Sequence, residues 1–106
     1  MDENEFAGLA ERALERIEAA LEESGVEADV ERKEGGVLEI EYADGSRMVI
    51  NRHAAAREIW VAARAGGFHF RWDGAAWRDT RSSTELFAAL SKIVSTQSGQ
   101  AVLLRP

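Results

Sequence analysis

One face of the predicted N-terminal helix carries four glutamates: Glu11, Glu15, Glu18 and Glu22. At about 100° of rotation per residue, these side chains fall in one narrow sector beside the apolar stripe of the helix. Carboxylate oxygens without His or Cys suit hard cations such as Mg²⁺, Ca²⁺, Mn²⁺ or oxidised iron, bound weakly and with water completing the shell. The spacing therefore predicts a cation-binding ridge. A solvated helix face that keeps the protein in solution is the alternative interpretation.

The acidic character continues beyond this helix and divides the chain in two. Residues 1–45 carry 15 Asp and Glu against 4 Lys and Arg, whereas residues 46–106 carry 4 against 9. A charge distribution of this kind predicts a surface that attracts cations or basic partners. It also adds four residues to the candidate metal ligands: Glu23, Glu27, Asp29 and Glu31.

Trp60 is a second candidate, because strand alternation separates it from its apolar neighbours. If Ile59 and Val61 face the core, Trp60 lies on the uncovered face of the sheet among polar side chains. An exposed Trp beside Arg and Asn is typical of a protein-binding hot spot. The alternative is a Trp that folds under a loop as an outlying part of the core. The side chains predicted on this face are Glu39, Glu41, Arg47, Val49, Asn51, Trp60, His69 and Arg71.

Other common chemistries find no support in the sequence. The chain has no cysteine, which excludes disulfides, thiolate metal sites and cysteine nucleophiles. The two histidines, His53 and His69, have no metal-ligand or catalytic-triad companion at a recognisable spacing, so we expect both to be polar surface residues. GxSxG, phosphate-loop and HExxH motifs are absent as well. We therefore expect a binding protein with no catalytic residue.

Hydrophobic periodicity predicts the elements that must position these residues. A helical period runs from Glu3 to about Glu23 and stops at Ser24-Gly25, and the segment 26–34 is expected to be a loop leading into an edge strand. Period-two alternation, with turn signals at Asp44-Gly45 and Asp73-Gly74, predicts strands around 37–42, 47–51, 58–62, 68–72 and Trp77. A second helix is predicted from Ser83 to about Ser95, capped by Ser82 or Ser83, with an extended segment at 101–104.

This order of elements predicts an α+β fold, in which an α-β sandwich packs the N- and C-terminal helices on a single face of one antiparallel sheet. A chain of 106 residues without a linker or repeat fits one domain over 1–106. The acidic N-terminus and the lack of a long apolar run lead us to expect a cytoplasmic protein that contacts no membrane. A pI near 4.9 argues against nucleic-acid binding, which depends on clustered Lys and Arg.

The central block of the chain resembles the bacterial frataxin family, and the acidic first helix and the closing helix fit as well. The resemblance implies an α-β sandwich that binds ferrous and ferric iron weakly on an acidic ridge and takes part in iron-sulfur cluster assembly. The residues that carry it are Gly35-Gly36-Val37-Leu38-Glu39-Ile40-Glu41-Tyr42, Asp44-Gly45-Ser46, Val49-Ile50-Asn51-Arg52, Ile59-Trp60-Val61-Ala62, Gly66-Gly67-Phe68-His69-Phe70, Trp77 and Asp79.

The resemblance also implies two partners. The ridge would bind a cysteine desulfurase, led by Glu18 and Glu22, and the sheet face around Asn51 and Trp60 would approach an iron-sulfur scaffold protein, with His69 and Arg71 beside them. Iron would be the only cofactor, and we expect a monomer in the absence of metal. The implied ridge residues are Glu11, Glu18, Glu22, Glu23, Glu27, Asp29 and Glu31, to which the helical wheel alone adds Glu15.

The chain departs from the family pattern at a few positions. Ala19 stands where an acid is frequent, and Glu58 where a neutral amide is usual. Arg32 and Lys33 precede Gly35, and we expect them to weaken cation binding at Asp29 and Glu31 more than at the helix. The alternative function is ferroxidase or iron-storage activity on the same carboxylates. A nucleic-acid module is disfavoured because Phe68, Phe70 and Trp72 alternate onto the predicted core face.

Overall fold

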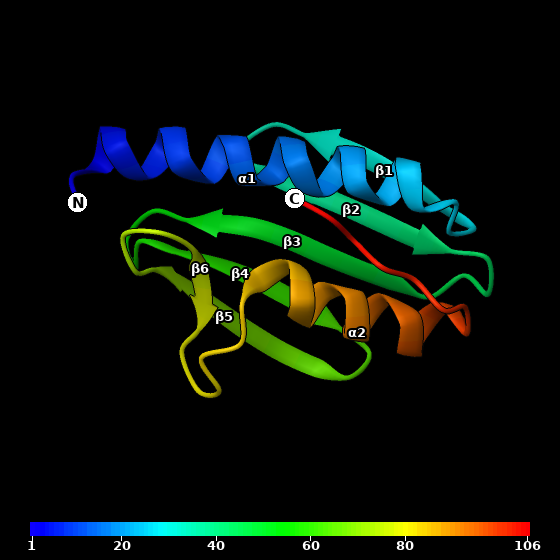
Figure 1. The fold of residues 1–106 in the computed structure, drawn as a ribbon. Helices are drawn as coiled ribbons and strands as arrows, with labels where there is room; N and C mark the ends of the chain where they lie inside the picture. The colour runs from blue at the N-terminus through cyan, green and yellow to red at the C-terminus, as the bar shows by residue number, and fades with distance from the viewer.

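The computed structural model describes all 106 residues and contains two helices and six strands (Figure 1). The chain order is helix, six consecutive strands, helix, and neither helix is long and apolar enough to cross a membrane. The elements are α1 (Glu3–Ser24), β1 (Ala28–Lys33), β2 (Val37–Tyr42), β3 (Arg47–His53), β4 (Glu58–Ala63), β5 (Gly66–Trp72), β6 (Trp77–Asp79) and α2 (Leu86–Ser98).

The six strands form one antiparallel sheet in the order β1-β2-β3-β4-β5-β6, so that every neighbour in the sequence is a neighbour in space. Short turns therefore make all the connections. The β2–β3 turn depends on Gly45, whose φ of 83° lies in the left-handed region that favours glycine. The predicted loop before residue 35 is mostly strand: β1 pairs with the whole of β2 as an edge strand.

Strand alternation places the same side chains inward that the sequence predicts. Leu38 and Ile40 on β2, Met48 and Ile50 on β3, and Ile59 on β4 have no exposed surface. Phe68 and Trp72 point to the same side but remain half-buried, whereas Phe70 between them is completely buried. The predicted inner face is thus confirmed across the sheet, with its packing densest in the middle strands.

Helix α1 begins and ends as the sequence predicts. The Asp2 side chain caps its first turn by accepting a hydrogen bond from the Glu5 N–H at 2.7 Å, and Gly25 ends it with a φ of 75°. Its apolar stripe is buried against the sheet, which leaves the charged faces of the helix along its two sides. The buried residues are Phe6, Ala10, Ala13, Leu14, Ile17, Ala20 and Leu21.

Helix α2 begins three residues later than predicted. Its cap is Glu85, whose carboxylate accepts hydrogen bonds from the N–H groups of Phe87 and Ala88 at 2.9 and 3.1 Å. Ser83 cannot cap, because the chain turns there with a φ of 64° and Ser83 donates its own N–H to the Asp79 carbonyl. The predicted start at Ser83 with a serine cap is therefore wrong, and the helix also runs three residues past Ser95.

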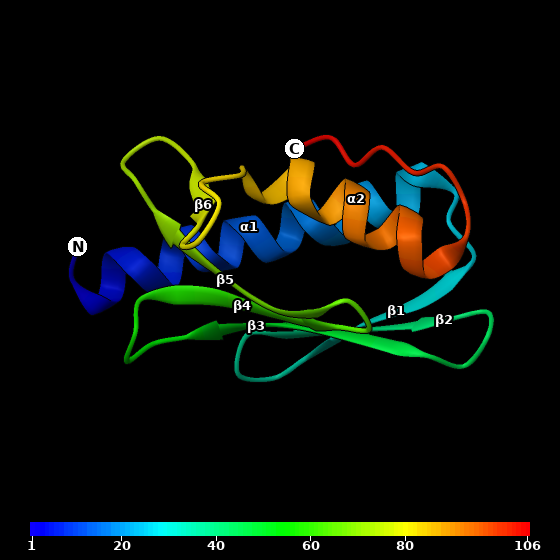
Figure 2. The ribbon, with the colours of Figure 1, turned by 90° about the horizontal axis from the view of Figure 1, so that it is seen from below.

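Both helices lie on one face of the sheet, and the other face is uncovered (Figure 2). The segment after α2 runs back along the helices without forming a strand, and Val102 and Leu104 are buried there. Two serines of α2 hold it: Ser95 accepts from the Val102 N–H at 2.9 Å and Ser91 from the Leu104 N–H at 2.8 Å. The α-β sandwich with a single covered face is confirmed.

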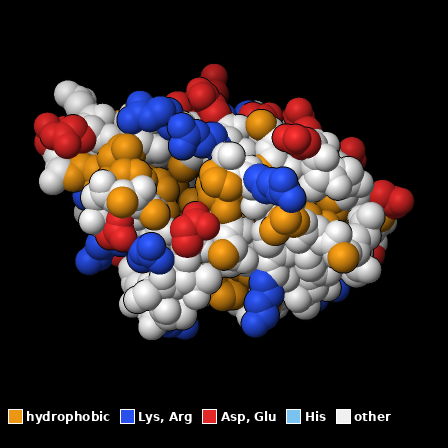
Figure 3. Space-filling model, viewed as in Figure 1, with side chains coloured by type: hydrophobic (Ala, Val, Ile, Leu, Met, Phe, Trp, Pro, Cys, Tyr) orange, Lys and Arg blue, Asp and Glu red, His pale blue; other side chains and the backbone are white.

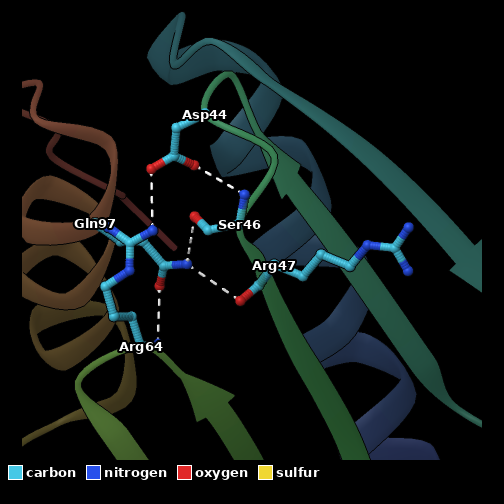
Figure 4. Close-up of polar contacts among 5 residues, drawn as sticks. All are labelled: Asp44, Ser46, Arg47, Arg64 and Gln97. Atoms are coloured by element: carbon cyan, nitrogen blue, oxygen red, sulfur yellow. Dashed lines mark hydrogen bonds and ion pairs between the residues drawn. The ribbon is translucent and has the colours of Figure 1, made fainter.

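A buried amide ties the end of α2 to the sheet (Figure 4). Gln97 donates to the Ser46 hydroxyl at 3.0 Å and to the Arg47 carbonyl at 3.1 Å, and accepts from the Arg64 N–H at 3.2 Å. Asp44 completes the cluster, since hydrogen bonds from Ser46 and then Arg64 lower its pKa to about 2. Three separate parts of the chain meet at this one side chain.

Candidate functional site

The predicted helix ridge, comprising Glu11, Glu15, Glu18 and Glu22, lies along the side of α1 that faces β1. Figure 3 shows several acidic side chains along the upper rim of the molecule, where α1 lies. Glu15 and Glu22 are exposed, whereas Glu11 and Glu18 are half-buried beside the strand. The helix thus presents its carboxylates at the seam between the two layers, where β1 can contact them.

Arg32 of β1 reaches into the helix ridge. Its Nη2 donates to Glu11 Oε1 at 2.5 Å, and its Nη1 lies 3.7 Å from Glu18 Oε1. The hydrogen bond to Glu11, opposed by partial burial and helped by the charges of Glu11, Glu18 and Glu15, raises the pKa of Arg32. This guanidinium is a fixed positive charge among three of the four ridge carboxylates.

The placement of Arg32 corrects one expectation about the basic residues of β1. Alternation points Arg32 to the helix side, while Asp29 and Glu31 are exposed on the opposite face. Arg32 therefore neutralises Glu11 and Glu18, and not Asp29 and Glu31 as expected from their positions in the sequence. Glu22, one turn beyond the reach of Arg32, makes no ion pair.

Asp29 and Glu31 join two glutamates that the sequence-based metal set did not include. Pairing of β1 with β2 sets Asp29 opposite Glu41 and Glu31 opposite Glu39 on the uncovered face. Two basic side chains lie nearby: Lys33 Nζ is 3.4 Å from Glu39, and an Arg47 guanidinium nitrogen is 3.5 Å from Glu41. Only the pairing of β1 with β2 brings these four carboxylates together, and the expectation of a loop over 26–34 did not indicate it. We call them the strand acids: Asp29, Glu31, Glu39 and Glu41.

A depression at the start of β1 brings Glu27 beside two of the strand acids. Glu27, Asp29 and Glu41 line this shallow depression, next to the β2–β3 turn. No three Asp, Glu or His side chains lie close enough to chelate a single metal ion. Carboxylates in this arrangement can hold a hydrated cation by charge and through water, with one or two direct ligands. Among the eight predicted metal ligands, those that make no ion pair are Glu15, Glu22, Glu23, Glu27, Asp29 and Glu31.

Trp60 lies on the uncovered face as predicted, and it is half-buried between two imidazoles. The ring centroids of Trp60 and His53 are 3.8 Å apart with planes at 12°, and those of Trp60 and His69 are 4.5 Å apart at 11°. His53 is fixed by its Nδ1, which accepts the Ala56 N–H at 3.2 Å. The stack spans three strands and involves no loop folded over the Trp. The alternative interpretation, a Trp that folds under a loop as an outlying part of the core, is therefore wrong.

A carboxylate lies beneath this stack. Glu58 is 5% exposed, and its two oxygens accept from Trp60 Nε1 at 2.9 Å and from Arg71 Nη2 at 2.6 Å. Burial is the strongest influence and opposes its ionisation, but the hydrogen bonds from Trp60 and Arg71 and the charges of Arg71 and His69 outweigh it, so the pKa of Glu58 is lowered. We call this group the Trp60 surface: Asn51, His53, Glu58, Trp60, His69 and Arg71.

The sequence predicted most of this surface but not its internal contacts. Asn51 and His69 flank Trp60 in the register, and Arg71 follows opposite Glu58. His53 and the buried position of Glu58 were missed, because a stack across three strands has no counterpart in local spacing. The pairing Asn51–Trp60–His69 could have indicated that His53, two residues after Asn51, lies within reach of the indole.

The chain is similar to known proteins over almost its whole length. Residues 1–100 match the model of the frataxin-like domain. The iron-sulfur cluster assembly protein CyaY of Dechloromonas aromatica is 61% identical over 105 residues, covering 99% of this chain and all of that protein. The CyaY of Cupriavidus metallidurans is 48% identical over 108 residues, covering 99% and 97%.

A solved structure agrees with the sequence relatives. The frataxin from Psychromonas ingrahamii, described as a model to study stability modulation within the CyaY protein family, superposes with a TM-score of 0.90 at 30% identity and full coverage of both chains. The helix ridge, the strand acids and the Trp60 surface therefore belong to a chain of the frataxin family, in the CyaY group of iron-sulfur cluster assembly proteins.

Proposed function

We propose that this protein acts in iron-sulfur cluster assembly as an iron-binding modulator of the assembly machinery. It binds ferrous or ferric iron weakly on the exposed carboxylates of α1 and β1, docks on the cysteine desulfurase through the same acidic edge, and meets the scaffold protein with the Trp60 surface. Iron is its cargo, and it works as a donor, sensor or regulator in the cytoplasm. Its relatives are named as iron-sulfur cluster assembly proteins, which supports the general role.

The observation that carries the proposal is the run of unpaired carboxylates at one edge of the fold. Glu22, Glu23 and Glu27 follow one another around the α1–β1 turn, all exposed and none in an ion pair. Their oxygens suit iron, and their spread over an open surface suits weak binding with rapid release. The same negative surface attracts a basic protein partner and accelerates its association.

The arrangement favours a binding protein over a ferroxidase or a storage protein. A di-iron oxidation centre requires carboxylates projecting inward from facing helices, ideally with histidine, to hold two ions close together. Here the ridge comes from one helix, and both histidines lie on the Trp60 surface of the sheet. Under air, iron oxidation with saturating protein should therefore proceed no faster than with the metal alone.

Cluster formation on a scaffold protein by purified desulfurase tests the proposal directly. The assay is run with and without this protein across a range of iron concentrations. We expect the wild type to change the rate in an iron-dependent way, and the double charge reversal Glu18→Lys and Glu22→Lys to abolish that change. Metal titration and desulfurase binding of the double variant should weaken together, because both depend on the same edge.

A matched control distinguishes the effect of the ridge positions from the effect of net charge. Glu3→Lys with Glu5→Lys makes the same change in net charge on exposed positions of the same helix, ahead of the ridge. It should retain the iron-dependent effect. If the ridge variant kept both metal titration and desulfurase binding, the assignment of this edge would be wrong.

A further inference from the structure

Glu58 is the most enclosed ionised group on an otherwise open face. Its side chain is 7% exposed, whereas the side chains of its partners Arg71 and His69 are 64% and 47% exposed. A carboxylate in this position is costly unless its oxygens are hydrogen-bonded. Both oxygens of Glu58 are hydrogen-bonded, one to the Trp60 indole and one to the Arg71 guanidinium, with His69 Nδ1 at 3.6 Å.

These contacts decide what the Trp60 surface can offer to another molecule. The indole N–H is directed to Glu58 and is not available to a partner. The flat faces of the indole are covered by His53 and His69, which leaves the edges of three stacked rings exposed. Arg71 donates one of its five N–H groups to Glu58. The other four belong to an exposed side chain and are available to a partner.

We propose that Glu58 is the positioning residue of the Trp60 surface and that it holds Arg71 ready for a carboxylate on the docking partner. This rests on the proposed function, in which the partner is the scaffold protein. A guanidinium fixed at one end loses less conformational freedom on binding than a free side chain does. It also presents its remaining donors in the planar geometry that a carboxylate matches in pairs.

The surface therefore fits one kind of partner segment. An apolar side chain of the partner would pack on the edges of the ring stack, and an acidic residue next to it would pair with Arg71. Backbone carbonyls alone would not match the planar pair of donors that Arg71 keeps free. The other strand cations on this face are Lys33, Arg47 and Arg78, each with an acidic side chain within 3.5 Å but none in contact with the ring stack.

A double-mutant cycle on scaffold binding tests this role. The variants are Glu58→Gln, Arg71→Gln and both together, with the affinity for purified scaffold protein measured by calorimetry. The amide keeps the size of Glu58 but lacks the negative charge that holds Arg71, so we expect each single change to weaken binding about tenfold. The double variant should be no weaker than the single ones, because Glu58 acts through Arg71.

Three further measurements distinguish positioning from a loss of structure. Melting temperature and desulfurase affinity should stay unchanged in Arg71→Gln, an exposed position. The scaffold affinity of the wild type should fall more steeply with NaCl than that of Arg71→Gln, since one charge pair is missing in the variant. Glu34→Gln, an exposed position with the same charge change as Glu58→Gln, serves as the control and should bind the scaffold as the wild type does.

The outcomes separate the two proposals. If Glu58→Gln binds within twofold of the wild type while Trp60→Ala abolishes binding, the positioning role is overturned and the docking surface stands. Additive losses in the double variant would also overturn it. If Trp60→Ala binds the scaffold normally, the surface is not the docking site, and both the positioning role and that part of the proposed function fail.

Discussion

At the scale of single residues, Arg32 determines how many ridge carboxylates are free. It is paired with Glu11, lies 3.7 Å from Glu18, and its charge also acts on Glu15. A metal ion at this part of the helix would have to compete with a positive charge that belongs to the protein. The carboxylates without a cationic partner are therefore Glu22 and those around the α1–β1 turn. They lie at the edge of the fold to which the proposed function assigns iron and desulfurase binding.

Replacing Arg32 should therefore strengthen metal binding. In Arg32→Gln, the carboxylates of Glu11 and Glu18 are released, and we expect a several-fold tighter titration of Mn²⁺ or Fe²⁺ with new paramagnetic broadening at residues 11–18. The loss of stability should be within about 1 kcal/mol, because the pair is partly exposed. Arg81→Gln removes an exposed positive charge elsewhere and is the control. Equal titrations for the two variants would contradict this account of the ridge.

Tyr42 makes a separate prediction about high pH. Its side chain is buried, its hydroxyl donates to Met48 Sδ at 3.6 Å, and burial together with the charge of Asp44 raises its pKa from 10.0 to about 12. The folded state therefore holds the proton more tightly than the unfolded state. This contribution is complete below pH 10 and is lost as the pH rises from about 10 to about 12.

The variant Tyr42→Phe has no such proton to lose. Urea unfolding at several pH values should show the wild type losing about 2 kcal/mol more than Tyr42→Phe between pH 10 and pH 12. The two proteins should have similar stabilities near pH 7, since only a weak sulfur hydrogen bond is removed. Parallel curves above pH 10 would show that Tyr42 ionises freely in the folded protein.

At the scale of elements, the sequence was sufficient wherever a period repeats within one element. Alternation around Ile40 and Ile50 and the helical spacing around Ile17 predicted the inner faces correctly, because burial itself imposes those periods. The start of α2 was not predictable in this way. Ser82 and Ser83 are good cap residues by type, but the chain needs them for the turn that leads from β6, and Glu85 is left to cap the helix.

The two cap assignments make opposite predictions for stability. Glu85→Ala should cost about 1 kcal/mol, because two N–H groups of the first turn lose their acceptor. Ser83→Gly should instead be neutral or stabilising, since glycine adopts the positive φ of 64° without strain. Thermal and urea unfolding of both variants give the comparison. A larger loss of stability for Ser83→Gly than for Glu85→Ala would support the serine cap instead.

The candidate site shows the same limit. Helical spacing was enough to place four glutamates on one side of α1, since the contacts are within one element. The contact between Arg32 and Glu11 joins residues 21 positions apart, and the stack of His53 on Trp60 depends on the pairing of β3 with β4. Such contacts follow from register and from side-chain reach across layers, which local periodicity does not determine.

At the scale of the whole molecule, the edges of the sheet bear on self-association. An edge strand offers unpaired N–H and C=O groups to another chain, and charges or short length on that strand discourage the pairing. The edge strand β1 exposes Asp29, Glu31 and Lys33, and β6 at the opposite edge is only three residues long. Two copies would also bring their negatively charged edges together.

We therefore expect a monomer of 11.7 kDa when metal is removed by a chelator. Size-exclusion chromatography with light scattering measures this, and the mass should stay constant as the protein is concentrated. Asp29→Val with Glu31→Val removes two charges from the exposed edge and should promote association. Concentration-dependent dimers of the wild type in chelator would show that charge on β1 does not protect the edge.

The stack of Trp60 between two imidazoles has a spectroscopic consequence. A protonated imidazole in contact with an indole accepts an electron from the excited ring and quenches its emission. Trp72 and Trp77 contact each other and are stacked on neither histidine, so Trp60 is the tryptophan whose fluorescence the two imidazoles should quench. The protein carries an optical probe at the centre of the face that the scaffold protein is proposed to cover, and the arrival of a partner could be followed there without a label.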